Sequence, residues 1–154
     1  MDRSEKARWT PHGEALTQLI LEIFKVNGRL LAAGDRLAAP VGLTSARWQV
    51  LGAIGLASSA QPVASLARSM GLTRQAVQRL VNELAAEGFV AFNDNPHHQR
   101  AKLVVLTKRG RDAFDAVSRL QVPWVNDLAA HLPAKSLAAA TQVLAALTRQ
   151  LDAI

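Results

Sequence analysis

The chain has 154 residues, enough to bury a core of its own without help from disulfides or a structural metal. Hydrophobic residues make up 49% and charged residues 19%, which excludes a disordered chain, and the absence of cysteine excludes disulfides, thiolate metal sites and cysteine nucleophiles. The net charge is +6, and the positive charge is concentrated in residues 60–111, which hold eight of the 18 basic residues but only three of the 12 acidic ones. A polyanion such as nucleic acid is therefore a candidate partner of that segment.

No segment reaches the roughly 18 uncharged apolar residues that a membrane span requires. Residues 1–14 are polar and lack the apolar stretch of a secretory signal. We therefore expect a cytoplasmic protein that does not contact a membrane.

The first predicted element is one long helix over residues 14–38, because apolar residues recur there at helical spacing on one face. Gly28 and Gly34 weaken this helix, but the apolar phase continues through both. Pro40 and Gly42 end it.

A second helix is predicted from the N-cap Thr44 to about Leu56. Its expected inward residues are Trp48, Leu51 and Ile54. The polar residues 58–62 that follow are predicted to form a loop.

Two short helices come next, over residues 63–70 and 73–87, and both repeat apolar residues at the spacing i, i+3, i+4, i+7. Gly71 ends the first helix, Thr73 caps the second, and Gly88 stands where a left-handed residue is expected. Two such helices joined by a three-residue turn are typical of a helix-turn-helix.

A hairpin follows, with predicted strands over residues 89–92 and 102–106 joined by the turn formers of residues 93–99. A hairpin directly after a helix-turn-helix is a wing. Residues 107–131 return to helical spacing, with Pro123 expected to kink the helix. The last predicted helix has Pro133 at its first position and carries a stripe of Leu137, Leu144, Leu147 and Leu151.

The expected fold is therefore mainly α with a small β-hairpin wing, in a single domain that spans residues 1–154. Residues 44–106 are predicted to form the winged helix-turn-helix that binds DNA. Residues 14–38 and 107–154 are predicted to be dimerisation helices, because a terminal apolar stripe is typical of an interface between subunits.

The helix over residues 73–87 exposes side chains that can read DNA bases. With its apolar residues facing the core, the opposite face carries Arg74, Gln75, Gln78, Arg79 and Asn82. Arginine can bind guanine, and glutamine or asparagine can bind adenine, through paired hydrogen bonds. We expect Arg74, Gln75 and Gln78 to reach base edges, and Arg79 and Lys108 to contact phosphates. The alternative is an ordinary solvated helix face, against which the basic hairpin that follows is the main argument.

The runs GLTRQAVQRLVNELAAEGFV from Gly71 and NPHHQRAKLVVLTKRGRDAF from Asn95 resemble the winged helix of the MarR (multiple antibiotic resistance regulator) family. The run LTSARWQVLGAIG from Leu43 is similar to the second helix of that family, and the long terminal helices match its dimerisation elements. The resemblance covers nearly the whole chain. It implies a homodimeric transcriptional regulator that binds palindromic DNA and is released by a small ligand.

The predicted wing departs from the family at one position. Arg100 corresponds to the family's arginine that enters the minor groove, but His98 stands where the family commonly has an acid. A carboxylate would orient the guanidinium, whereas a neutral histidine can only accept one hydrogen bond and a charged one would repel it. Asp94 is an alternative support across the loop. The expected DNA contacts of this part of the chain are His98, Arg100 and Lys102, together with the cap residue Thr73.

A ligand site is implied by the resemblance, with Trp48 and Trp124 lining an aromatic pocket; core packing is the alternative role of both. Arg47 and Arg29 are candidate anchors for an acidic ligand, or ordinary exposed arginines. His97 and His98 are adjacent on a hairpin and point to opposite faces, so we expect no metal site and no cofactor.

The sequence lacks a P-loop, a Gly-x-Ser-x-Gly motif, a dinucleotide fingerprint and a His-Glu-x-x-His motif. We therefore expect that the protein is not an enzyme. The predicted function is a sequence-specific repressor that acts as a homodimer on double-stranded DNA and responds to a small aromatic or acidic effector. The alternative is a winged-helix module for non-specific DNA binding or for protein contacts, without a ligand.

Overall fold

The computed structural model describes residues 8–154, so the first seven residues of the polar N-terminal segment lie outside the described part of the chain. The contacts group the chain into two compact units, residues 8–114 and residues 115–154, and each is considered by itself. The structure is mainly helical with one small antiparallel sheet, as the sequence predicts.

The long first helix α1 (Pro11–Ala38) is continuous through both of its predicted weak points, Gly28 and Gly34. It begins three residues earlier than expected, because the side chain of Thr10 accepts a hydrogen bond from the Gly13 amide and Pro11 occupies the first turn. A short 3-10 turn, η1 (Ala39–Val41), follows it.

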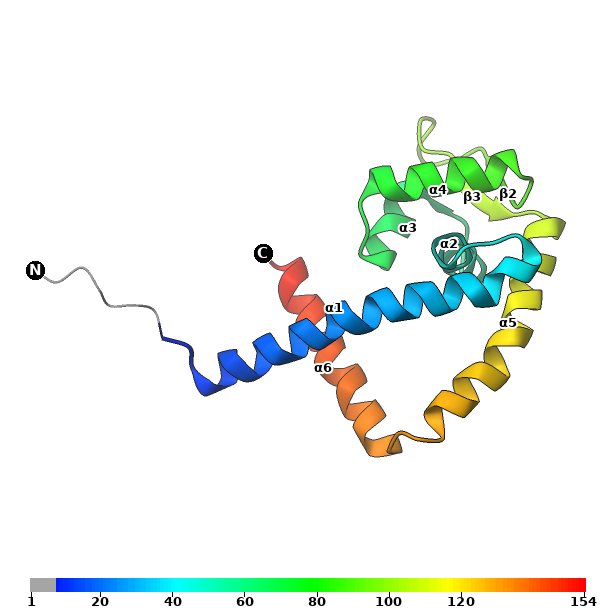
Figure 1. The fold of residues 1–154 in the computed structure, drawn as a ribbon. Helices are drawn as coiled ribbons and strands as arrows, with labels where there is room; N and C mark the ends of the chain where they lie inside the picture. The colour runs from blue at the N-terminus through cyan, green and yellow to red at the C-terminus, as the bar shows by residue number, and fades with distance from the viewer. Residues whose placement is uncertain (1–7) are drawn as a thin grey trace, which may run out of the picture. The chain divides into compact units, whose positions relative to one another are not determined.

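The winged helix consists of α2 (Ser45–Leu56), β1 (Gln61–Pro62), α3 (Val63–Met70), α4 (Arg74–Ala86), β2 (Val90–Asn93) and β3 (Leu103–Leu106). Figure 1 shows these elements gathered near the C-terminal end of α1. Thr44 and Thr73 cap α2 and α4 as predicted, and Gly71 and Gly88 adopt the left-handed conformation at the two expected turns.

The sheet has the strand order β1-β3-β2, and both pairs are antiparallel. The predicted hairpin β2–β3 is present, with Ala91 opposite Val105. The prediction of a loop over residues 58–62 is wrong at its end, because Gln61 and Pro62 pair with Val104 and Leu103. Two residues are too few to show a strand periodicity, and Pro62 is compatible with a strand only at the sheet edge.

The core of this unit lies between the sheet and the helices of the winged helix. Its fully buried side chains include Val50, Leu51, Leu66, Val77, Val81, Leu84 and Val104. The prediction that Trp48 and Ile54 point inward beside Leu51 is only partly correct, because both are half-buried. Val50 is fully buried instead, because α2 packs against several elements, namely α1, α3, α4 and β3.

Helix α5 (Lys108–Ala129) continues through Pro123, and α6 (Ala134–Asp152) completes the chain. Pro133 occupies the N-cap of α6 and not the first helical position that the sequence suggested. No residue of α6 is buried within the chain. Among residues 8–154, no helix combines the length and the apolar character that crossing a membrane would need.

Candidate nucleic-acid interface

Helix α4 is held so that one polar face stays free. Its cap Thr73 accepts a hydrogen bond from the Ala76 amide at 3.1 Å, which fixes where the helix begins. The apolar residues Val77, Leu80, Val81 and Leu84 are buried, as predicted. Their burial leaves Arg74, Gln75, Arg79 and Asn82 exposed and Gln78 half-buried.

The side chain of Gln78 is oriented by its neighbour one turn later. Its Nε2 donates a hydrogen bond of 2.9 Å to Oδ1 of Asn82. This bond leaves the second N–H of the Gln78 amide and its carbonyl oxygen available, which are the two groups that pair with adenine.

The wing is built on a tight turn at Asn95. Oδ1 of Asn95 accepts a hydrogen bond from the His97 amide at 3.0 Å, and its carbonyl accepts one from the His98 amide at 3.2 Å. Across the hairpin, Nζ of Lys102 donates to Oδ1 of Asp94 at 2.5 Å. The hydrogen bond from Lys102, and then its charge, hold the pKa of Asp94 below its ordinary value.

The acid of the wing therefore supports Lys102 and not Arg100. Asp94 was the alternative partner for Arg100, but its carboxylate is engaged by Lys102. Within residues 8–154, Arg100 forms no ion pair, and its side chain is exposed at the tip of the wing.

A groove of about 620 Å³ lies between the beginning of α4 and the wing. It brings together five of the predicted DNA contacts, namely Arg74 and Gln78 from α4 and His98, Arg100 and Lys102 from the wing. Its remaining lining residues are Pro62, Val63, Ala64, Phe92 and Ala101. The groove is thus basic at both walls and apolar between them.

Sequence reasoning missed Phe92 as a groove residue. Phe92 shares a strand face with the buried Val90, so alternation alone would predict that it is buried as well. It is 40% exposed, because this end of β2 faces the groove.

Four predicted DNA contacts do not line the groove. Thr73 is exposed at the N-cap of α4, and Gln75 and Arg79 are exposed on the helix itself. Lys108 lies at the start of α5, where its Nζ pairs with Oδ2 of Asp112 at 2.7 Å, and this hydrogen bond and the charge of Asp112 raise the pKa of Lys108.

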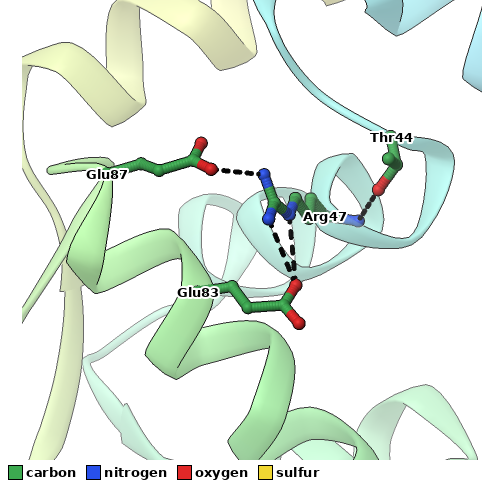
Figure 2. A network of polar contacts seen from close by, with 4 residues as sticks. All are labelled: Thr44, Arg47, Glu83 and Glu87. Carbon is green, nitrogen blue, oxygen red and sulfur yellow. Dashed lines mark hydrogen bonds and ion pairs between the residues drawn. The ribbon is translucent and has the colours of Figure 1, made fainter.

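Arg47, a predicted ligand anchor, is engaged within the protein. Its Nη1 donates to Oε1 of Glu87 at 2.9 Å, and its Nε and Nη2 donate to Oε2 of Glu83 at 3.3 and 3.2 Å (Figure 2). Burial alone would lower the pKa of Arg47, but the hydrogen bonds and charges of Glu87 and Glu83 outweigh it and raise that pKa.

The other proposed ligand residues are not brought into the groove. Arg29 is exposed on α1, and Trp48 is half-buried on α2. Trp124 is half-buried and belongs to the second unit. Their role in binding a ligand stays a prediction. Among residues 8–154, no group of three or more histidine or acidic side chains is placed to hold a metal ion.

Comparison with known proteins gives a family match over the winged helix. A sequence profile of the MarR family matches residues 41–101. An uncharacterized protein of Mycobacterium tuberculosis is 35% identical over 116 residues, which span 75% of this chain and 80% of the relative. The transcriptional activatory protein BadR of Rhodopseudomonas palustris is 27% identical over 111 residues, which span 71% of this chain and 63% of BadR.

Solved structures share the fold along most of the chain. The transcriptional regulator MOSR of M. tuberculosis, in complex with DNA, matches with a TM-score of 0.75 at 22% identity over 87% of this chain and 96% of MOSR. CouR of Rhodococcus jostii, bound to p-coumaroyl-CoA, matches with a TM-score of 0.75 at 22% identity over 84% of this chain and 91% of CouR.

Proposed function

The chain belongs to the MarR family of transcription regulators, and from this membership we propose that it binds a palindromic DNA operator as a homodimer and regulates transcription. The observation that carries the proposal is the groove between α4 and the wing. Two basic walls from separate elements face one space, which suits a duplex whose major groove takes a helix and whose backbone or minor groove takes the wing.

The division of labour follows from side-chain chemistry. Arg74, Gln75 and Gln78, at the beginning of α4, are proposed to contact base edges in the major groove. Arg79 and Lys108 are proposed to contact phosphates, which gives affinity without sequence preference. Arg100, at the tip of the wing, is proposed to enter a narrow minor groove, where the potential is most negative at A·T-rich sequence.

Control by a small ligand is part of the proposal, supported by the complex of CouR with p-coumaroyl-CoA. The ligand of this chain would be an aromatic or acidic molecule, for which Trp48 and Arg29 are the remaining candidate contacts. We propose a cytoplasmic repressor without enzymatic activity. Because BadR is named a transcriptional activatory protein, activation of transcription is the competing hypothesis. Expression of a reporter gene with and without the protein distinguishes repression from activation.

The test of DNA recognition starts from a random pool of duplexes. The wild-type protein should enrich one palindromic sequence, and its affinity for that duplex should exceed its affinity for a scrambled duplex by a factor on the order of 10³ or more. Equal affinity and equal salt dependence for both duplexes would instead support the alternative function, a module for non-specific DNA binding or protein contacts.

A further inference from the structure

Arg47 joins the first turn of α2 to the second half of α4 through the Arg47 bridge, which comprises Arg47, Glu83 and Glu87. We infer that Arg47 is a positioning residue for DNA recognition: by fixing the tilt of α4, it sets where the base-contacting side chains at the other end of that helix stand. The inference rests on the proposed function, since it concerns how the same DNA-binding helix is held.

The geometry of the bridge suits orientation better than a loose surface ion pair. Three N–H groups of one planar guanidinium engage two carboxylates, which restricts both the distance and the rotation between the helices. The Arg47 side chain is only 19% exposed, against 41% for Glu83 and 43% for Glu87. Partial burial of the cation limits the screening that weakens exposed pairs.

Helix α4 needs a cation at this place. Glu83 and Glu87 are one helical turn apart, so their charges repel each other. Both lie toward the C-terminal end of the helix, where the helix dipole disfavours negative charge, and the last turn of α4 carries no basic residue of its own. Arg47 supplies the missing charge from another helix.

The helix that carries Arg47 is a firm reference point. The Thr44 side chain caps α2 by accepting from the Arg47 amide at 3.2 Å, and Oδ1 of Asp35 on α1 accepts from the Ser45 amide at 2.7 Å. At Gly34, α1 approaches so closely that an added Cβ would lie 2.6 Å from Oγ of Ser45. The polar contacts therefore continue from α1 through the start of α2 to α4.

Small changes at the bridge are amplified at the DNA. Gln75 lies twelve residues before Glu87 in the chain, which is roughly 18 Å along a helix. A tilt of about 5° around the bridge would move Gln75 by roughly 1.5 Å at that distance. Paired hydrogen bonds to a base edge do not survive such a shift, whereas phosphate contacts from long side chains adapt. Loss of the bridge should therefore reduce sequence preference more than affinity for DNA in general.

The experiment compares Arg47→Met with wild type on two probes. One probe is the duplex of about 30 base pairs that the wild type enriches from a random pool, and the other is a scrambled duplex of the same composition. We expect the ratio of the two affinities to fall about tenfold in Arg47→Met, while affinity for the scrambled duplex and the salt slope stay unchanged. The control Arg36→Met also removes one positive charge from the same unit, but Arg36 is exposed and forms no ion pair within residues 8–154. It should keep the wild-type ratio.

Three further variants separate positioning from folding and from charge. Arg47→Lys keeps the charge but cannot span both carboxylates. Its affinity ratio should therefore lie between the ratio of the wild type and that of Arg47→Met. Glu87→Gln removes the charge from one acceptor of the Arg47 bridge at an exposed position, which weakens that arm of the bridge. If Arg47→Met does not fold, Glu87→Gln should lower the ratio in its place. Arg47→Met combined with Glu83→Gln and Glu87→Gln removes the repulsion between the acids without restoring the link, so the ratio should stay low.

Each outcome decides the inference. A ratio unchanged in folded Arg47→Met, with only the melting temperature lowered, overturns it and leaves the proposed function intact. So does a ratio restored by the triple variant, in which all three replaced side chains are uncharged, and so does a salt slope reduced by about one in Arg47→Met, which would make Arg47 a phosphate contact. A wild type that enriches no sequence overturns the proposed function, and with it the inference.

Discussion

Gln75 is the residue at which base recognition can be tested most directly. It is exposed near the beginning of α4, and its side-chain amide forms no hydrogen bond within residues 8–154, so that amide is available to a base. Gln75→Ala should relax the preference at one operator position and cost about 1–3 kcal/mol there, as a repeated selection from the random pool would reveal.

The matched variant is Arg79→Ala, on the same exposed face of α4. As a phosphate contact, it should weaken binding to all duplexes alike and reduce the salt slope by about one. Uniform weakening by Gln75→Ala would contradict its assignment to a base edge.

The wing gives a prediction about Arg100. Arg100→Ala should weaken operator binding most when the flanks of the site are A·T-rich, because the narrow minor groove of such sequence has the most negative potential. His98→Asp places a carboxylate near Arg100 and should not cause this loss. Titrations of duplexes with A·T-rich and G·C-rich flanks measure the difference, and an equal loss on both duplexes for Arg100→Ala would contradict a minor-groove contact.

The ion pair across the hairpin gives a prediction about pH. The hydrogen bond and charge of Lys102 lower the pKa of Asp94 from its ordinary value of 3.8. A carboxyl group whose pKa is lowered in the folded state stabilises above its ordinary pKa and loses that effect as the pH falls through the lowered value. Asp94→Asn should therefore remove a part of the pH dependence of stability that lies below pH 3.8, as urea denaturation at a series of pH values would measure. A pH dependence that Asp94→Asn leaves unchanged would contradict the stabilising role of the ion pair.

Among the elements, the junction between α4, β2 and α5 is the most tightly specified. Oγ1 of Thr107 donates to the Gly88 carbonyl at 2.6 Å and accepts from the Gly110 amide at 3.0 Å. A Cβ added to Gly110 would lie 1.9 Å from the Phe89 carbonyl oxygen, so the backbone would have to move. Gly110→Ala should therefore lower the free energy of unfolding by about 1–3 kcal/mol or more, as urea denaturation would measure.

The control for that substitution is Gly28→Ala on α1, where an added Cβ meets nothing within 4 Å. It should stabilise the helix by about 0.5–1 kcal/mol, because alanine loses less backbone entropy than glycine on folding. Equal unfolding free energies for the two variants would contradict the close approach at Gly110.

The sequence predicts elements well where the signals are local. The boundaries of α4 follow from Thr73 and Gly88, which act within one turn of their own positions. Strand β1 was missed because only its pairing with β3, about 40 residues later in the chain, makes it a strand. The partners of Arg47 were missed for the same reason, since they lie 36 and 40 residues away. The sequence gives the charges, and the fold decides which of them meet.

The candidate site shows the same division. Helical spacing is enough to place Arg74, Gln75 and Gln78 on one exposed face, because the apolar residues of α4 determine its orientation. Helical spacing could not predict the partner of Asp94, because the turn at Asn95 determines which cation lies across the hairpin. The sequence offered Asp94 as a possible support for Arg100, whereas in the structure Asp94 pairs with Lys102.

At the scale of the whole molecule, α6 carries the strongest indication of a dimer. Leu144 and Leu151 are two turns apart on one face and are 42% and 61% exposed within the chain. Apolar surface of this kind is typical of an interface between subunits. A dimer would also place two copies of α4 about 34–36 Å apart, one turn of DNA, as a palindromic operator requires.

Leu144→Glu combined with Leu151→Glu should therefore convert a dimer into a monomer, because each glutamate would place an unpaired charge in the apolar interface. Light scattering at micromolar concentration measures the mass, and the same samples are titrated with the selected operator duplex. We expect the double variant to have half the wild-type mass and to lose the operator affinity that comes from engaging two half-sites together, while keeping the weaker affinity of one winged helix. Gln142→Glu, at an exposed polar position of the same helix, should change neither the mass nor the affinity. A double variant that stays dimeric would place the interface elsewhere, and a wild type with the mass of one chain would contradict the dimer itself.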